Sequence, residues 1–207
     1  MMLGFDRILR PSPGEPMNLS LKIKAALVVA SSVFCAIAAA QQPDRLTISR
    51  AGEAYVLAVP VSRLEMTLPA GRLVQQAADI GGSTSSPRYF QFSDPGQGLI
   101  LSGWFEPASA FKGFAAFWEE EQEAWKKKGL PVPMNVSTGK VGPWETVFYE
   151  HQFRPGLLNS HVRAHLVQAG TWIDLHISVT AKESGAKNRA TIESILQSIA
   201  VKEKPGG

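Results

Sequence analysis

Apolar and polar residues alternate along most of the chain after residue 44, which is typical of half-buried β-strands. Runs of this kind, rich in β-branched and aromatic residues, predict strands over 45–50, 53–59, 63–68, 88–93, 98–105, 143–153, 160–168 and 171–180. Asp94-Pro95-Gly96-Gln97 separates two of these runs and predicts a hairpin connection. A polar loop is expected over 78–86.

Two segments show helical spacing instead. The first runs from Pro107 to Lys128, and Gly129 and Pro131 are expected to end it. Its apolar stripe consists of Phe111, Phe114, Trp118 and Trp125. This stripe predicts that Trp118 and Trp125 are buried. The second helix is expected over 186–200, with a stripe of Ile192, Ile195, Leu196 and Ile199.

The order of these elements predicts the fold class. Strands, a helix, more strands and a closing helix follow one another with short connections. This order favours an α+β fold with an antiparallel β-sheet flanked by helices, in a single domain over 41–207.

The first 40 residues have the features of an export signal. Lys22 and Lys24 precede an apolar run over 25–37, and Ala38-Ala39-Ala40 forms a signal-peptidase site. We expect cleavage after Ala40 and a periplasmic location. An uncleaved anchor is the alternative, and either Met1 or Met17 can be the start.

Composition narrows the function classes. The first 40 residues hold four of the 21 basic and two of the 18 acidic residues, so residues 41–207 have a net charge of +1. Nucleic-acid binding needs a basic surface, so no nucleic-acid partner is expected. No membrane span is expected after cleavage. Cys35 is the only cysteine and leaves with the signal. No catalytic motif is found, and neither a metal nor another cofactor is predicted.

The helical core FWEEEQEAW, the strand WIDLHISVT and the closing ESILQSI resemble the PsbP-like fold family over about 54–201. This family includes the extrinsic PsbP subunits of photosystem II and bacterial DcrB-like periplasmic proteins. The resemblance implies an α-β-α sandwich and a non-enzymatic binding or assembly role. It identifies no functional residue, because it depends on the order of elements and on no signature motif.

The last two strands predict a polar face. Matching apolar residues across the Ala169-Gly170 turn pairs Leu166 with Ile173 and Ala164 with Leu175. The same register places His165 opposite Asp174 and Arg163 opposite His176.

Two further residues are candidates for the polar face, and the spacing of two histidines excludes a zinc site between them. Trp172 shares the polar face, and Glu150 of the preceding strand is a candidate to face Arg163. His161 and His165 lie four residues apart on one strand, a span of about 13 Å, so they cannot bind one zinc ion.

The polar face has two interpretations. As a ligand-binding face, it binds an anion, and the candidate residues are Glu150, Arg163, His165, Trp172, Asp174 and His176. As a structural face, it is solvated or covered by a helix, with ordinary cross-strand pairs. In both cases the carboxylate beside His165 is expected to favour the charged imidazole.

The sequence therefore predicts an exported, non-enzymatic periplasmic accessory or binding protein of PsbP-like type. Its partner is expected to be an envelope protein or a small anionic ligand. The alternative is a small periplasmic hydrolase or metal-dependent enzyme that uses the polar face. The oligomeric state stays open.

Overall fold

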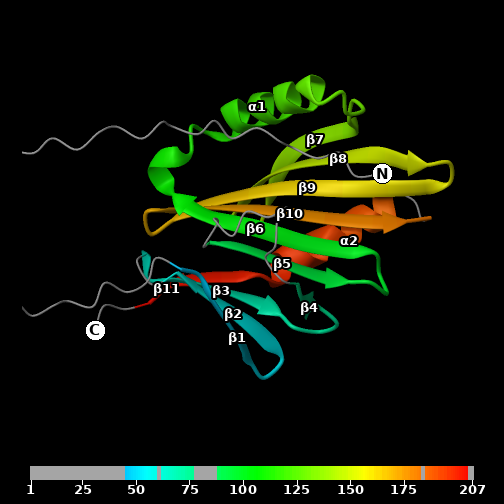
Figure 1. Cartoon of the computed structure of the whole chain (residues 1–207). Coiled ribbons are helices and arrows are strands. Elements are labelled where there is room, and N and C mark those ends of the chain that lie inside the picture. The colour runs from blue at the N-terminus through cyan, green and yellow to red at the C-terminus, as the bar shows by residue number, and fades with distance from the viewer. Residues whose placement is uncertain (1–44, 60–61, 77–87, 183–184, 205–207) are drawn as a thin grey trace, which may run out of the picture. The chain divides into compact units, whose positions relative to one another are not determined.

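The structure, a computed structural model, describes residues 45–59, 62–76, 88–182 and 185–204. The expected signal segment over 1–40 and the expected loop over 78–86 lie outside these residues. The described part is a single α+β domain built mostly from antiparallel strands (Figure 1).

The described part contains eleven strands, which form two sheets, and two α-helices. The four-stranded sheet has the order β1-β2-β3-β11, with β1 Thr47–Ala51, β2 Ala54–Val59, β3 Leu64–Pro69 and β11 Ala200–Glu203. The seven-stranded sheet has the order β4-β5-β6-β10-β9-β8-β7, with β4 Val74–Gln75, β5 Tyr89–Asp94, β6 Leu99–Pro107, β7 Met134–Val141, β8 Trp144–Arg154, β9 Leu157–Gln168 and β10 Thr171–Ala181. The helices are α1 Phe114–Lys127 and α2 Gly185–Ser198.

The main core lies on one face of the seven-stranded sheet, here called the core face. Its strands contribute fully buried residues such as Leu101, Ala164 and Ile177. The helix α2 adds Ile192 and Leu196, which are also fully buried. The four-stranded sheet belongs to the same cluster, which consists of Tyr55, Leu57, Val59, Leu64, Met66, Leu68, Ala70, Phe90, Phe92, Leu99, Leu101, Phe105, Val141, Trp144, Phe148, Val162, Ala164, Ile173, Leu175, Ile177, Val179, Ile192, Leu196 and Ile199. In the expected stripe of the closing helix, Ile192 and Leu196 are buried as predicted and Ile195 is half-buried. Ile199 is also buried, but it follows the helix, which ends at Ser198 before β11 begins.

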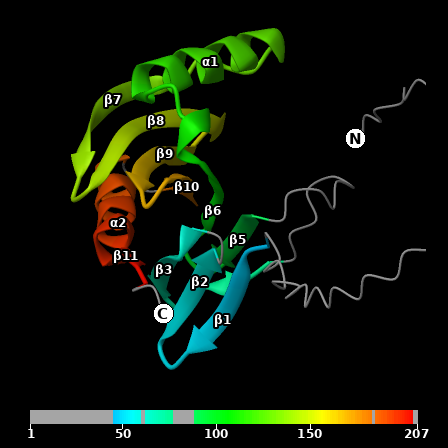
Figure 2. The ribbon, with the colours of Figure 1, turned by 90° about the vertical axis from the view of Figure 1, so that its left-hand side faces the viewer.

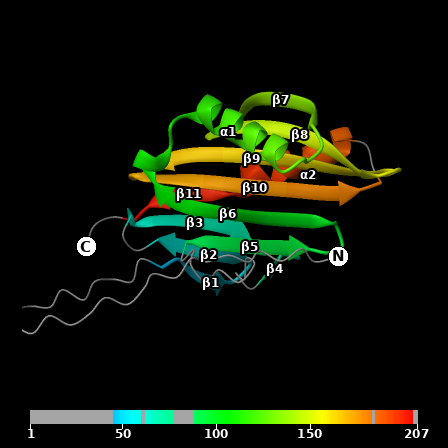
Figure 3. The ribbon, with the colours of Figure 1, turned by 45° about the horizontal axis from the view of Figure 1, so that its top comes forward.

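The other face of the seven-stranded sheet is covered by α1. Figure 2 shows α1 and α2 on opposite sides of this sheet, and Figure 3 shows α1 in front of β8 and β9 with α2 behind. Because α2 leads into β11, which pairs with β3, the chain end connects the two sheets.

The hairpin of β9 and β10 has the predicted register. Leu166 pairs with Ile173 and Ala164 pairs with Leu175. The turn residues Ala169 and Gly170 both have positive φ angles, 49° and 69°. Two successive left-handed residues form the turn that matches the twist of two antiparallel strands, so the turn fixes this register.

The start of the first helix was predicted wrongly. Pro107 ends β6, where it pairs with Thr171, and a short 3-10 turn follows over Ala108–Ala110. The helix begins only after Gly113, whose φ of 102° is open to glycine and strained for other residues. The end of a strand and a 3-10 turn therefore occupy the region that helical spacing had assigned to the first turn of the helix.

The burial of Trp118 and Trp125 was also overestimated. Both side chains are half-buried, and no residue of α1 is fully buried. The reason is that α1 lies outside the main core, on the polar face of the sheet. Its tryptophans contact the sheet on one side and solvent on the other.

Three strands and the second sheet were not predicted. The strand β7 carries mostly exposed residues, and β4 and β11 are only two and four residues long. Such segments give little alternation of apolar and polar residues. None of the helices in the described ranges is long and apolar enough to cross a membrane.

Candidate functional site

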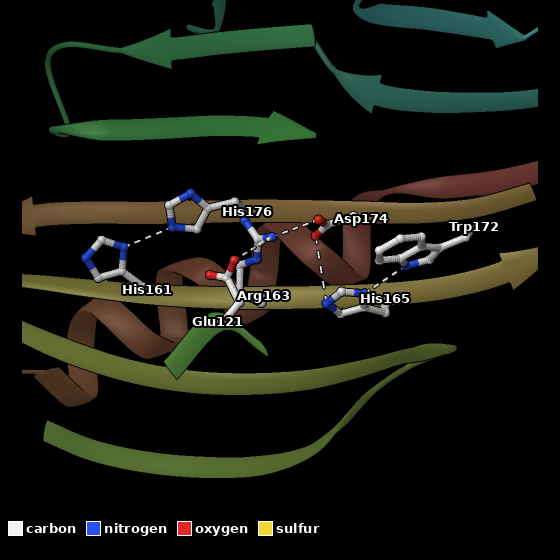
Figure 4. Close-up of polar contacts among 7 residues, drawn as sticks. All are labelled: Glu121, His161, Arg163, His165, Trp172, Asp174 and His176. Atoms are coloured by element: carbon white, nitrogen blue, oxygen red, sulfur yellow. Dashed lines mark hydrogen bonds and ion pairs between the residues drawn. The ribbon is translucent and has the colours of Figure 1, made fainter. Parts of the chain in front are cut away.

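Six polar or aromatic side chains lie together on the sheet face beneath α1. We call this set the polar face; it consists of His161, Arg163, His165, Trp172, Asp174 and His176 (Figure 4). Alternation places them there, because their strand neighbours Val162, Ala164 and Leu175 point into the core. The backbone pairs His165 with Asp174 and Arg163 with His176, as the sequence predicted.

The guanidinium of Arg163 reaches diagonally across the hairpin to Asp174. Its Nη2 donates to Asp174 Oδ2 at 2.8 Å, and both side chains are about nine-tenths buried. Glu121 of α1 places Oε1 3.9 Å from the same Nη2. The ring of Phe117, also on α1, lies 4.9 Å from the guanidinium carbon, within cation–π range. Arg163 therefore connects the sheet to α1.

His165 has a defined tautomer. Trp172 donates its indole N–H to His165 Nδ1 at 2.8 Å, so Nδ1 is an acceptor and Nε2 carries the proton. His165 Nε2 lies 3.8 Å from Asp174 Oδ1, which is too far for a hydrogen bond. The predicted His165–Asp174 pair therefore exists in the backbone register but has no side-chain hydrogen bond.

Aromatic rings enclose His165. Phe111 and Trp172 stack on it with centroid distances of 5.6 and 5.5 Å, and Phe117 approaches to 4.2 Å. Burial, followed by the charge of Arg163, lowers the pKa of His165 to about 3. The expectation that Asp174 favours a charged His165 was therefore wrong, because desolvation outweighs the attraction of the carboxylate.

The carboxyl group of Asp174 responds to the same desolvation in the opposite direction. Burial raises its pKa to about 6, although the charge of Arg163 acts to lower it. Its Oδ1 has no hydrogen-bond partner among the described residues. Asp174 is thus an ionisable group whose charge changes just below neutral pH.

His161 and His176 form a second pair on the polar face. His161 Nδ1 lies 3.0 Å from His176 Nε2, so the N–H of one ring donates a hydrogen bond to the nitrogen of the other. Tyr149 of β8 stacks on His161 with a centroid distance of 4.8 Å. Burial, and then the charge of His151, lower the pKa of His161 to about 4. Burial also lowers the pKa of His176, helped by Arg163 and His161. These histidines are neutral at physiological pH.

Aromatic contacts from α1 complete the cover of the polar face. Trp118 and Trp125 lie 5.5 and 5.1 Å from the ring of Tyr149, and Trp118 packs edge-on against Trp125. Helical spacing brings these side chains to the sheet side of α1, which is where the sequence placed the stripe. The polar face is therefore covered by a helix and is not solvated.

Glu150 does not belong to the polar face. It pairs with Ser160, on the core face of the sheet, and Asn135 and Ser160 donate to its carboxylate. A β-bulge between Gln152 and Arg154 shifts the register of β8 against β9. Without the extra residue Glu150 would pair with His161, so the bulge moves the carboxylate to the other face.

The contacts of the polar face do not resemble those of a metal centre. Within the described ranges, no group of three or more His, Cys, Asp or Glu side chains is arranged to hold a metal ion. His161 and His176 direct nitrogen atoms at each other, and His165 uses Nδ1 to accept from Trp172.

The sequence reasoning missed residues that α1 and β8 bring to this face, namely Phe117, Glu121 and Tyr149. Phe117 lies one position before Trp118 of the assigned stripe, and Glu121 was not among the candidate residues. Both contact Arg163. The helical spacing of Phe114, Phe117 and Glu121 was the signal that could have placed them on one side of α1.

An open cleft of about 740 Å³ lies on the core face, between α2 and the segment that follows β3. Its lining residues are Leu68, Pro69, Ala70, Gly71, Arg72, Leu73, Asp94, Gln97, Leu99, Leu101, Lys187, Ala190, Thr191, Ser194, Ile195, Ser198 and Ile199. None of them was a candidate in the sequence, because only the folded topology brings α2 against the four-stranded sheet. We call this feature the α2 cleft.

Comparison with known proteins leaves the family open. No protein-family model matches the chain, and no curated protein sequence matches it. A crystal structure of a protein from Bacteroides thetaiotaomicron VPI-5482 aligns with a TM-score of 0.37 and 16% identity, covering 68% of this chain and 46% of that one. This chain thus spans less than half of its length. A similarity this weak says nothing about function, which has to be argued from the geometry.

Proposed function

We propose that the chain is an exported, non-enzymatic periplasmic binding protein of PsbP-like type. The fold would then be an α-β-α sandwich in which α1, the seven-stranded sheet and α2 are the layers. The placement of α1 and α2 on opposite faces of that sheet supports this arrangement (Figure 2). The export signal expected over 1–40 supports the periplasmic location.

The observation that carries the proposal is the closure of the polar face. Arg163 is held by Asp174, His165 by Trp172 and His161 by His176. These contacts direct the functional groups at one another and leave the polar face as a structural layer that anchors α1. Binding would then take place on the opposite side of the sheet, at the α2 cleft.

A pocket of this kind suits binding without chemistry. Ligand pockets of about 300–1,000 Å³ with an apolar lining and a few polar groups are typical small-molecule sites. The α2 cleft fits this description, with leucines and isoleucines inside and Arg72, Asp94 and Lys187 among its polar residues. A small anionic ligand or an envelope protein remains the expected partner.

Recovery of the protein from cells tests the proposal. The tagged protein would be purified from a bacterial envelope fraction and examined by native mass spectrometry. A stoichiometric small molecule or partner protein is expected with the wild type and with H165F, a polar-face variant. Ser194 lines the α2 cleft and is exposed. The S194W variant should therefore recover less partner. Partner loss in H165F with full retention in S194W would contradict the proposal.

One observation favours the alternative, a small hydrolase or metal-dependent enzyme. The pKa of Asp174 is raised to about 6, and its Oδ1 and His165 Nε2 have no hydrogen-bond partner among the described residues. Perturbed ionisable groups are frequent in active sites. Ester hydrolysis, or stoichiometric zinc, that disappears in both D174N and H165F would establish this alternative.

A further inference from the structure

The lining of the α2 cleft combines apolar residues with polar and charged ones. Leu73 and Ile195 are half-buried apolar residues of the lining, and the nearly or fully buried Leu68, Leu99, Leu101 and Ile199 also belong to it. Arg72, Lys187 and Ser194 are exposed and belong to the same lining. An occupant that satisfies both parts needs an apolar body and a polar end.

The charge of the lining indicates the sign of that polar end. The charged residues that line the cleft are Arg72, Lys187 and Asp94, which together carry a net positive charge. Arg72 Nε lies 3.5 Å from Asp94 Oδ2, but the arginine side chain is 67% exposed. Asp94 Oδ1 also accepts the backbone N–H of Gly96 at 2.9 Å. Asp94 therefore keeps a hydrogen bond when Arg72 turns toward a ligand.

From this arrangement we propose that the α2 cleft binds a single-chain amphiphile with an anionic head group, of the fatty-acid class. This inference rests on the proposed binding function and names its ligand class. The acyl chain would lie against Leu73, Leu99 and Ile195, and the carboxylate would face Arg72 and Lys187. Arginine and lysine suit this head group because both donate charged hydrogen bonds to carboxylates.

Cleft-filling variants separate this site from other apolar surfaces. Ser194 is exposed on α2 and lines the cleft, so S194W places an indole inside it without changing a core residue. Gln197 is also exposed on α2 and is not among the lining residues, so Q197W is the matched control.

The experiment is isothermal titration of the purified, delipidated protein with dodecanoate below its micellar concentration. Saturable binding at a stoichiometry of about one is expected, weakened about tenfold or more by S194W and changed less than about twofold by Q197W. K187E should weaken binding about tenfold, and dodecyltrimethylammonium, with the same chain and a cationic head, should bind at least about tenfold more weakly.

Three results would overturn the inference: no saturable binding of dodecanoate, equal binding of both head groups, or unchanged binding by S194W. The proposed binding function has a separate test: it fails if no stoichiometric partner is recovered from the cell envelope. A protein partner recovered without dodecanoate binding would therefore reject the ligand class and retain the binding function. Circular dichroism of S194W and Q197W checks that both variants fold.

Discussion

The two faces of the seven-stranded sheet differ in the polarity of their side chains and in how they are covered. On the polar face, charged and aromatic side chains are paired with one another and closed off by α1. On the core face, the packing of α2 and the four-stranded sheet leaves the α2 cleft open beside an apolar core. The face that carries the paired histidine, arginine and aspartate side chains is covered by α1, and the mainly apolar face carries the accessible cleft.

This difference shows how polar residues can be mistaken for a site. Arg163, His165 and Asp174 have the composition of an active site, yet each contacts a residue of the fold. Buried polar groups that hydrogen-bond to one another can specify a packing arrangement as well as a function. On this view the polar face determines where α1 lies.

The largest expected effect comes from breaking the Arg163–Asp174 pair. R163M removes the cation and a hydrogen-bond donor from the buried carboxyl group of Asp174, which must then stay charged without a partner or take up a proton on folding, and this is expected to cost about 3–5 kcal/mol of unfolding free energy near neutral pH. Urea unfolding measures this loss. The double variant R163M/D174L should recover most of it, because no buried charge is left.

The matched control is R72M, which removes an arginine from the α2 cleft. The side chain of Arg72 is 67% exposed, and its partner Asp94, although buried, keeps the backbone N–H of Gly96 as a donor, so the loss of Arg72 should cost less than about 1 kcal/mol. Equal losses for R163M and R72M would contradict the distinction between the two faces.

The second largest effect is acid destabilisation of the polar face. Folding lowers the pKa of His161 to about 4 and that of His165 to about 3, and it also lowers the pKa of His176. Such residues bind protons more readily when unfolded, so stability falls as pH decreases below about 6.5. Asp174 changes stability in the opposite direction. Because its pKa is raised to about 6 in the folded protein, its protonation on acidification favours the folded state.

The histidines outnumber Asp174, so a net loss of about 3 kcal/mol is expected between pH 7 and pH 4. Arg163, Glu121 and Glu106 also face this cluster. Urea unfolding across this pH range measures the slope, and H165F should make it shallower by removing one titrating group. A slope identical in H165F and wild type would show that His165 is not held neutral in the fold.

Much of this architecture could be predicted from the sequence. Period-two alternation and the short Ala169-Gly170 turn were enough to predict the β9–β10 register, because one slip would have reversed every side chain. The strands on either side of Asp94-Pro95-Gly96-Gln97 were predicted for a similar reason. Local patterns decide which residues share a face.

The side-chain partners could not be predicted in the same way. Arg163 is long enough to bypass His176, which faces it, and to bind Asp174 on the diagonal. Glu150 was misplaced because one extra residue in β8 moves it to the core face, and nothing in the alternation announces a bulge. The α2 cleft was not predicted because residues of both sheets line it, and the sequence predicted only one sheet.

A third, smaller effect compares the aromatic cover with the core. Trp118 is half-buried, so W118A should cost about 1–2 kcal/mol, below the about 3–5 kcal/mol of a fully buried tryptophan. F92A, in the main core, should reach about 3–5 kcal/mol because Phe92 is fully buried. Urea unfolding of both variants decides whether α1 is a covering element or part of the core.

The smallest expected effect concerns the ionic contact between α1 and the sheet. Glu121 Oε1 lies 3.9 Å from Arg163 Nη2, and Asp174 already binds that nitrogen at 2.8 Å. E121Q should therefore cost less than about 1 kcal/mol, and the cost should vanish in an R163M background, as a double-mutant cycle would measure. If E121Q instead costs more than W118A, charge and not aromatic packing holds α1 on the polar face. That outcome would make α1 sensitive to salt, whereas packing through Phe117, Trp118 and Trp125 predicts unfolding that is nearly independent of ionic strength.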